Sequence, residues 1–262
     1  MGLASKILGP NNLDEVDVMR HVFGRRRGVM IDVGANDGGA LLSFAASGWD
    51  VFAFEPDPNN REQLERNVAR FPNVRVDPRA ISEIDNQVLP FYTSEVSTGI
   101  STLEPFHPTH LATTTVTTVR LDTFIQDHDL TEVNFLKTDT EGFDLQVLRT
   151  FPWESQSHPL AVVCEFEDRK TEPLGYVFGD LADFLVGLGY TLLVSEWYPV
   201  IEYGMQHRWR SLRRYPTSLH TPAAWGNILA VHPSLTRRTE LVIHAAALRL
   251  RVRRAAERVY RV

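Results

Sequence analysis

The sequence predicts one α/β domain with a doubly wound, mostly parallel sheet and helices on both of its faces. Three observations predict it. Short β-branched apolar runs alternate with helical segments in the order strand, helix, strand, helix, strand over about residues 29–77. The 262 residues are 43% hydrophobic and 23% charged, which suits one globular core. Glycine and proline stay near average usage and no period of about 20 to 50 residues recurs, which excludes disordered and repeat architectures.

The first elements follow from apolar runs and turn residues. Residues 29–34 are apolar and end in glycine, which is typical of a buried strand that enters a tight turn. A helix is expected at about 39–48 and a second strand over 50–55. The segment Pro56-Asp57-Pro58 then starts a charged helix that reaches about Arg70, and a third strand covers 73–77. Right-handed crossovers join such strands.

The later elements bring the expected sheet to about seven core strands. Residues 86–121 are rich in Ser and Thr, and we expect inserted strands and a mobile loop there. Parallel order then resumes with strands over 133–139, 160–165, 190–197 and 227–231 and helices at about 143–150 and 179–188. The chain thus divides into a polar lead-in (1–27), a main domain (28–235) and a basic tail (236–262).

The tail is a separate electrostatic unit. The whole chain carries a net charge of −6, but residues 236–262 hold eight arginines against two glutamates, so the tail is +6 and the remainder −12. The net charge of −6 argues against nucleic acid as the main partner, because nucleic-acid binding needs a cationic surface. The tail predicts an amphipathic helix with the apolar stripe Leu241, Ala245, Leu248, Val252, Ala255 and Val259. Such a helix can dock on the domain, form a homodimer seam or touch an anionic membrane.

Cysteine usage and hydropathy favour a reducing, cytoplasmic setting. Cys164 is the one cysteine, so no internal disulfide can form, and no Cys/His cluster has the spacing of a zinc site. No apolar run approaches about 18 residues, and the first residues lack the apolar core of a signal peptide. We expect a soluble chain, with peripheral membrane contact as the one exception.

The strongest functional signal is the segment Ile31-Asp32-Val33-Gly34-Ala35-Asn36-Asp37-Gly38-Gly39. Glycine lets the backbone approach a ligand, and in a doubly wound sheet this turn lies at the carboxyl ends of the strands. Glu55 ends the next expected strand, 21 residues after Gly34. A carboxylate there can accept both ribose hydroxyls of an adenosine ligand, so the pair predicts a nucleoside site.

Two phosphate-binding patterns that are absent from the sequence narrow the choice of nucleoside ligand. The spacing Gly34-x-x-x-Gly38 departs from the Gly-x-Gly-x-x-Gly pattern of dinucleotide sites, and the chain has no P-loop. Asp32, at the end of the first strand, suits a ligand with a cationic amine or sulfonium more than one with phosphates. S-adenosylmethionine carries both cations. An NAD-dependent oxidoreductase on the same fold remains the alternative enzyme, although no Tyr-x-x-x-Lys pair is present.

These residues resemble the motifs of the FkbM family of S-adenosylmethionine-dependent methyltransferases, Asp-Val-Gly-Ala-Asn-x-Gly, Glu-Pro and Asp-Val-Glu-Gly in that order. They stand here as residues 32–38, Glu55-Pro56 and residues 139–142, and the resemblance covers about residues 28–232. Thr140 replaces the usual valine or isoleucine, which should affect packing only. The resemblance implies the Rossmann-like class I methyltransferase fold, whose seven-stranded sheet has an antiparallel last strand.

The resemblance also implies roles for the cofactor site. Gly34, Ala35 and Asn36 would approach the methionyl part of S-adenosylmethionine, Glu55 its ribose, and Asp77 with Ala80 the edge of its adenine. The expected cofactor-binding residues are therefore Asp32, Gly34, Ala35, Asn36, Gly38, Glu55, Pro56, Asp77, Ala80 and Asp139.

Two further acidic segments are candidates for catalysis. Residues 137–142 follow a strand and open a helix, so their acids face the same crevice as Glu55. Asp139 either caps that helix or lies near the transferred methyl, and the resemblance and the crevice position favour the second role. Glu141 is expected only to complement the helix dipole. Glu165 and Glu167 end the next apolar run, and Glu165 aligns with a family glutamate.

Methyl transfer to a hydroxyl needs an aligned oxygen and a base. The candidate bases are Asp139, Glu165 and a histidine from a substrate-side segment, with His207 in the expected site and His107 and His110 as alternatives. Asp139 and Glu165 could instead hold one Mg²⁺ that acidifies the hydroxyl.

The segment 197–226 is expected to be a lid over the acceptor. Its aromatic residues are Trp197, Tyr198, Tyr203, Trp209, Tyr215 and Trp225, interspersed with Arg208, Arg210, Arg213 and Arg214. Aromatic faces pack on sugars, and arginines can fork onto phosphate or carboxylate. The alternative is core aromatics with solvated arginines.

The sequence therefore predicts a methyltransferase that moves a methyl group to a hydroxyl. The acceptor we expect is a small molecule, or a sugar of a glycolipid, glycan or glycosylated natural product. A non-enzymatic nucleic-acid or membrane adaptor, built on the basic tail and the Arg/Trp segment, is the alternative from another class.

Overall fold

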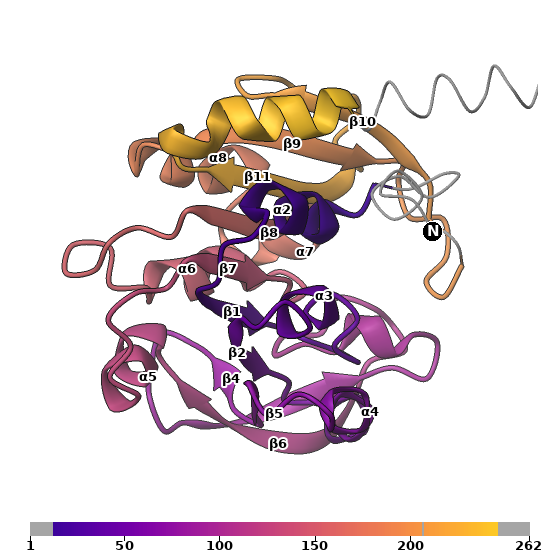
Figure 1. Ribbon diagram of the computed structural model, residues 1–262. Coiled ribbons are helices and arrows are strands. Elements are labelled where there is room, and N and C mark those ends of the chain that lie inside the picture. The colour runs from indigo at the N-terminus through magenta and orange to yellow at the C-terminus, as the bar shows by residue number, and fades with distance from the viewer. Residues whose placement is uncertain (1–12, 206, 246–262) are drawn as a thin grey trace, which may run out of the picture.

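The computed structural model, which describes residues 13–205 and 207–245, has an eight-stranded sheet in the order β10-β9-β11-β8-β7-β1-β2-β3 (Figure 1). Five neighbouring strands run parallel: β3 (Val74–Asp77), β2 (Asp50–Phe54), β1 (Val29–Val33), β7 (Phe135–Thr138) and β8 (Ala161–Glu167). The chain crosses from β3 to β7 on the other side of β1. This reversal opens a crevice at the carboxyl ends of the strands, where α/β sheets bind ligands.

The remaining strands are antiparallel to their neighbours. β11 (Trp225–Val231) lies between β8 and β9 (Thr191–Trp197) and is antiparallel to both. The seven expected strands and the antiparallel last strand are confirmed. β10 (Trp209–Arg214) adds an eighth strand, antiparallel to β9, inside the segment expected to be a lid. Its sequence Trp-Arg-Ser-Leu-Arg-Arg lacks the alternation that marks a strand, which is why the pattern missed it.

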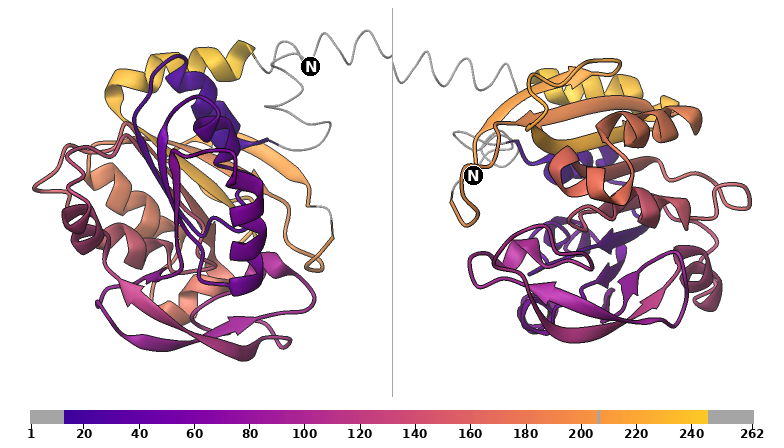
Figure 2. Two further views of the ribbon diagram at one scale, coloured as in Figure 1. Left: turned by 60° about the horizontal axis from the view of Figure 1, so that its bottom comes forward. Right: turned by 180° about the vertical axis from the view of Figure 1, so that it is seen from behind.

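Two layers of helices cover the two faces of the sheet. On one face, α2 (Glu15–Phe23), α3 (Leu42–Ala45) and α4 (Pro58–Val68) pack in one apolar cluster. On the other, α5 (Leu121–Asp127), α6 (Asp144–Arg149) and α8 (Phe178–Gly187) pack in a second cluster. The neighbours Met30 and Ile31 of β1 belong to different clusters, because successive side chains of a strand point to opposite faces. Figure 1 shows α2 in front of the sheet, and the right view of Figure 2 shows it behind.

The expected lead-in, 1–27, holds a folded helix. Asp14 caps α2 by accepting from the Asp17 N–H at 2.8 Å, and Met19 and Phe23 are fully buried in the same core as β1. A boundary at residue 28 therefore cuts through the packed core. The helical spacing of Val18, Met19, Val22 and Phe23 was the signal that could have found α2.

The insertion expected over 86–121 contributes a small second sheet. Its strands are β4 (Ala80–Ile81), β6 (Leu111–Val119) and β5 (Val88–Thr93), in the order β4-β6-β5, at the bottom of Figure 1. The loop between β5 and β6 carries the short turn η1 (Thr98–Ile100). That turn reaches the crevice, so the insertion forms one wall of the site.

The described part of the basic tail continues a helix that spans 233–245. It docks through Leu235 and Thr239, which are buried, whereas Leu241 is 62% exposed and Ala245 is exposed. The first two members of the expected stripe thus face away from the domain, and the others lie outside the described residues. Among the residues that the structure describes, none belongs to a helix long and apolar enough to cross a membrane.

Candidate functional site

A cavity opens at the carboxyl ends of β1, β2 and β7. Gly34, Glu55 and Asp139, which directly follow these strands, line it together with Asn36, Pro56 and Ala80. Six of the ten expected cofactor-binding residues therefore meet in one place.

The turn after β1 brings backbone close to the cavity. Gly34 has φ 77°, and a Cβ built on it would lie 1.9 Å from the carbonyl oxygen of Asp139. The N–H groups of Gly34 and Ala35 both donate to the carbonyl of Phe54 at 3.0 Å, which ties the turn to the end of β2. Only glycine fits such a close approach, so the tight turn predicted from the motif is confirmed.

Glu55 is held at the wall of this cavity by two backbone donors. Its Oε2 accepts from the Asn36 N–H at 2.6 Å and its Oε1 accepts from the Asp57 N–H at 2.9 Å. Burial raises the pKa of Glu55 to about 7, against the opposing effect of these hydrogen bonds. Each carboxylate oxygen keeps a free lone pair, so both ribose hydroxyls of an adenosine ligand can donate to it.

Asp32 lies behind the cavity rather than in its lining. It is fully buried, and its Oδ1 is 3.0 Å from Nζ of Lys137 on β7. Burial raises the pKa of Asp32, and Lys137 acts against that rise. The expectation that Asp32 meets a cationic ligand is therefore not supported, because Lys137 already neutralises it.

Lys137 also secures the turn beneath the ligand site. Its ammonium donates to the carbonyl of Gly34 at 3.1 Å and lies 3.7 Å from Oδ2 of Asp139. Burial alone would lower the pKa of Lys137, but Asp32 and Asp139 raise it. One buried cation thus joins the ends of β1 and β7.

Three other expected cofactor residues, Asp77, Gly38 and Ala35, lie next to the cavity but do not line it. Asp77 pairs with Arg79 at 2.6 Å, and it is Arg79 that lines the cavity. Gly38, at φ 83°, packs against Leu64 of α4, since a Cβ would lie 2.5 Å from that side chain. Ala35 is buried in the core. These residues shape the wall and are not part of the lining.

The loop between β7 and α6 is fixed by Asp144. This buried carboxylate accepts from the hydroxyl of Thr138 at 2.5 Å and from the hydroxyl of Thr140 at 3.0 Å. Thr140 was expected to matter for packing only, but its hydroxyl forms this additional hydrogen bond. Glu141 follows with φ 57°, a backbone conformation that costs free energy in a residue other than glycine. Such strain concentrates at functional sites.

A second cavity adjoins the first. Gly99, Asp139 and Glu141 line both cavities. The insertion loop adds Ser97 and Ile100 to the lining of the second cavity. The rest of the lining comes from the second half of the chain, namely Glu165, Glu167, Lys170, Val200, Tyr203, His207 and Trp225. The three expected catalytic residues, Asp139, Glu165 and His207, therefore lie around this one space.

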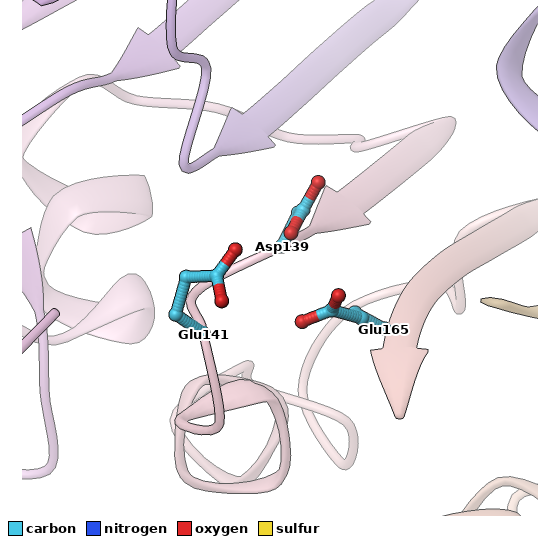
Figure 3. Close-up of side chains that lie close together, drawn as sticks. All are labelled: Asp139, Glu141 and Glu165. Atoms are coloured by element: carbon cyan, nitrogen blue, oxygen red, sulfur yellow. The ribbon is translucent and has the colours of Figure 1, made fainter. Parts of the chain in front are cut away.

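Carboxylates converge at the boundary between the cavities. Figure 3 shows the side chains of Asp139, Glu141 and Glu165 directed toward one another, and one oxygen of each lies within 4.8 Å of the others. Burial raises the pKa of Glu141 to about 7 and raises that of Glu165. Glu141 was expected only to complement a helix dipole, but its carboxylate is part of this cluster.

A lysine sits among these acids. Nζ of Lys170, on the short helix α7 (Asp168–Thr171), lies 2.5 Å from Glu141, 3.1 Å from Glu165 and 3.0 Å from Glu167. Burial alone would lower the pKa of Lys170, but the three carboxylates raise it. Three oxygen ligands at this spacing would suit Mg²⁺. The ammonium, however, already holds two of the three candidate ligands.

Of the three candidate histidines, His207 lines the second cavity, whereas His107 and His110 line neither cavity. His207 lines the second cavity with its ring 5.0 Å from that of Trp225, and burial lowers its pKa. His110 instead bonds the carbonyl of Ile100 at 2.9 Å, and His107 bonds Thr109 at 2.8 Å. Neither His107 nor His110 lines a cavity at the site, so both support the insertion loop.

The expected lid contributes aromatics but not arginines to the second cavity. Tyr203, whose pKa burial raises to about 12, lines it together with Trp225. Trp197 packs against Trp225, while the other aromatics lie elsewhere. The four arginines contact protein groups: Arg208 and Arg210 pack over Tyr198, Arg213 pairs with Glu196, and Arg214 with Glu240.

Lys137, Glu141, Lys170 and Arg79 are site residues that sequence reasoning missed. Lys137 stands in the segment that motif analysis singled out, two residues before Asp139. Lys170 follows Glu165 and Glu167 closely in the chain, which was the one local signal available. Lys137 pairs with Asp32 of β1 and Lys170 with Glu141, and only the fold shows these two pairs.

Two comparisons by sequence match parts of this chain. A sequence profile of the methyltransferase FkbM domain matches residues 32–192. The hexuronic acid methyltransferase AglP of Haloferax volcanii is 28% identical over 143 residues, which are 52% of this chain and 54% of that protein. The chain thus matches about half the length of this curated relative.

Solved structures with a similar course of the chain are distant in sequence. One is the precorrin-6y C5,15-methyltransferase of Geobacter metallireducens, 14% identical over 83% of this chain and 86% of that chain, with a TM-score of 0.43. Another is an S-adenosylmethionine-dependent O-methyltransferase of Thermotoga maritima. It is 14% identical over 88% of this chain and 71% of that chain, with a TM-score of 0.40.

Proposed function

Because the chain belongs to the FkbM methyltransferase family, we propose that it transfers the methyl group of S-adenosylmethionine to a hydroxyl of a sugar-bearing acceptor. One observation carries the proposal: two cavities meet at Gly99, Asp139 and Glu141. The first has the glycine turn and the buried acid that suit a nucleoside. The second has the carboxylates that suit a polyhydroxyl acceptor.

The residues of the first cavity fit S-adenosylmethionine. Gly34 leaves room for the methionyl part, and the carboxylate of Glu55 accepts from the ribose hydroxyls. Arg79 and Ala80 line the part of the cavity nearest the expected adenine edge. The bound donor supplies an electrophilic methyl carried by a sulfonium.

In the transfer, the carbon–sulfur bond to the methyl breaks as a carbon–oxygen bond to the acceptor forms, and the hydroxyl proton leaves to a base. Asp139 is our candidate base, since it lies at the wall shared by the two cavities. Glu165 and His207, on the acceptor side, orient the hydroxyl. Glu141, with its pKa raised to about 7 by burial, is the neighbouring proton acceptor.

The second cavity suits a sugar. Its carboxylates accept hydrogen bonds from hydroxyls, and Tyr203 and Trp225 offer aromatic faces to the apolar face of a ring. The name of the relative AglP, a hexuronic acid methyltransferase, supports an acceptor of this class. Alignment of donor and acceptor across the shared wall can supply about 7–11 kcal/mol of the barrier.

Calorimetric titration with S-adenosylmethionine, S-adenosylhomocysteine and NAD tests the donor. Binding of the first two but not NAD is expected, and Glu55→Ala should weaken it while circular dichroism stays unchanged. Binding of NAD alone would contradict the proposal.

Turnover is then followed by S-adenosylhomocysteine release with neutral sugars, uronic acids and glycosides as acceptors. Methyl ethers among the products are the expected outcome. A methylated amine, or a methyl ester alone, would correct the acceptor group.

A further inference from the structure

The ammonium of Lys170 is walled in among the acids of the second cavity. Its side chain is 2% exposed, and three carboxylates surround Nζ at 2.5 Å (Glu141), 3.1 Å (Glu165) and 3.0 Å (Glu167). The ring centre of Phe106 lies 5.2 Å from Nζ. The ammonium donates hydrogen bonds to both carboxylate oxygens of Glu165, at 3.3 and 3.1 Å, and forms ion pairs with Glu141 and Glu167.

The same oxygens would be needed by a divalent cation. Asp139, Glu141 and Glu165 form the one group of three potential ligands found among the described residues, with oxygens within 4.8 Å of one another. Two members of this group, Glu141 and Glu165, are partners of Lys170. A metal that binds there must displace the ammonium or share its ligands with a like charge only a few ångströms away, which costs free energy.

We propose that Lys170 is a positioning residue that takes the place of a divalent cation in the second cavity. Its ammonium gathers Glu141, Glu165 and Glu167 and presents them to the acceptor, so methyl transfer proceeds without a bound metal. The proposal rests on the proposed function only in treating this cavity as the acceptor side. Lys170 acts on the acceptor through the carboxylates that it pairs with.

Charge balance supports this role. Buried carboxylates need a neutralising partner, and removal of such a partner leaves them unpaired in a medium of low dielectric constant. Lys170 lies on α7, which follows β8 directly, and a Cβ added to Gly142 would lie 3.2 Å from Cβ of Lys170, so the loop after β7 packs closely against this helix. The fold therefore delivers a cation to the point where a metal would sit.

Mn²⁺ titration followed by electron paramagnetic resonance of the free ion tests the proposal. With and without S-adenosylhomocysteine, the wild-type protein is expected to bind no more Mn²⁺ than the variant Glu165→Gln. Lys170→Met should create a site at least tenfold tighter than any in the wild type, and Lys170→Met with Glu165→Gln should lose it again. A merely structural lysine would not produce this gain.

Arg169→Met is the matched control, since it removes one positive charge at the adjacent position and leaves the Lys170 ammonium in place. It should gain no site. Wild-type binding that Glu165→Gln abolishes overturns the proposal, and so does a folded Lys170→Met that gains no site. If Lys170→Met does not fold, the wild-type and Glu165→Gln titrations decide alone. Failure of the proposed function is seen separately, as absent S-adenosylhomocysteine binding.

Discussion

Asp32 and Lys137 form a buried ion pair, 3.0 Å between Oδ1 and Nζ, that joins the carboxyl ends of β1 and β7 beneath the glycine turn. Lys137 also donates to the carbonyl of Gly34 at 3.1 Å. The residue that motif analysis assigned to a cationic ligand thus pairs with a cation of the protein itself. The motif suggested a cationic ligand as the partner of Asp32, and in the structure the partner is the ammonium of Lys137.

The pair makes a stability prediction. Lys137→Met should lower the free energy of unfolding by about 3–5 kcal/mol, because it leaves the carboxylate of Asp32 buried without a partner. Denaturant unfolding measures the change. In the double variant Asp32→Asn, Lys137→Met the charge is removed, so part of the loss should be recovered. An unchanged stability of Lys137→Met would show that Asp32 is not ionised in the folded protein.

Affinity for S-adenosylhomocysteine should rise with pH. The ribose hydroxyls donate to ionised Glu55, and burial raises its pKa to about 7, so the carboxylate is mostly protonated below that pH. If only the ionised form binds, affinity at pH 6 should be about tenfold weaker than at pH 8. Calorimetry at both pH values measures this, and Glu55→Gln should remove the dependence.

A second acid at the cavity serves as the control for this pH effect. Glu141 lines the same cavity, and burial raises its pKa to about 7 as well. Glu141→Gln should leave the pH dependence of binding in place. If it removes the dependence instead, the titrating group is Glu141 and the ribose assignment fails.

The same raised pKa fixes the sign of a stability effect. Glu55 binds its proton more tightly in the folded than in the unfolded chain, so its contribution to stability is present below the unfolded value of about 4.5 and falls as pH rises toward 7. Wild-type protein should therefore lose more stability than Glu55→Gln between pH 5 and pH 7.5. Parallel denaturation curves at the two pH values compare them.

Asp139→Asn should reduce turnover by about 10²–10⁴-fold, the usual contribution of a positioned base. Binding of S-adenosylhomocysteine should stay within about threefold of the wild type, since the amide keeps the shape of the side chain. Glu165→Gln tests the acceptor side and should raise KM more than it lowers kcat. Intact turnover of Asp139→Asn under saturating donor would transfer the role of base to Glu141.

Thr140→Val restores the residue that the family pattern favours and should nevertheless destabilise the chain. It removes the 3.0 Å hydrogen bond to buried Asp144, at a cost of about 0.5–1.5 kcal/mol. Thr140→Ser keeps the hydroxyl and is the matched comparison in denaturant unfolding. Equal losses in the two variants would mean that packing, and not the hydroxyl, decides the stability.

The sequence alone predicted most strands of the main sheet and the residues that follow them in the crevice. Gly34, Glu55 and Asp139 each follow a buried strand, and the carboxyl ends of parallel strands meet at one edge, so their convergence follows from order and spacing. The predicted strands that became β1, β2, β8, β9 and β11 are mainly apolar runs, and β3 alternates valine with a charged residue; these local signals need no distant partner.

Tertiary structure decided the pairing of charges and the edges of the sheet. Asp32 and Lys137 are far apart in the chain, and Lys170 meets Glu141 only because α7 packs against the loop after β7. β10 exists because β9 offers it an edge, and not because of its own pattern. Periodicity and motifs determine which residues reach the crevice, whereas long-range contacts determine which charges neutralise one another there, because such pairing depends on distances that a one-dimensional pattern does not contain.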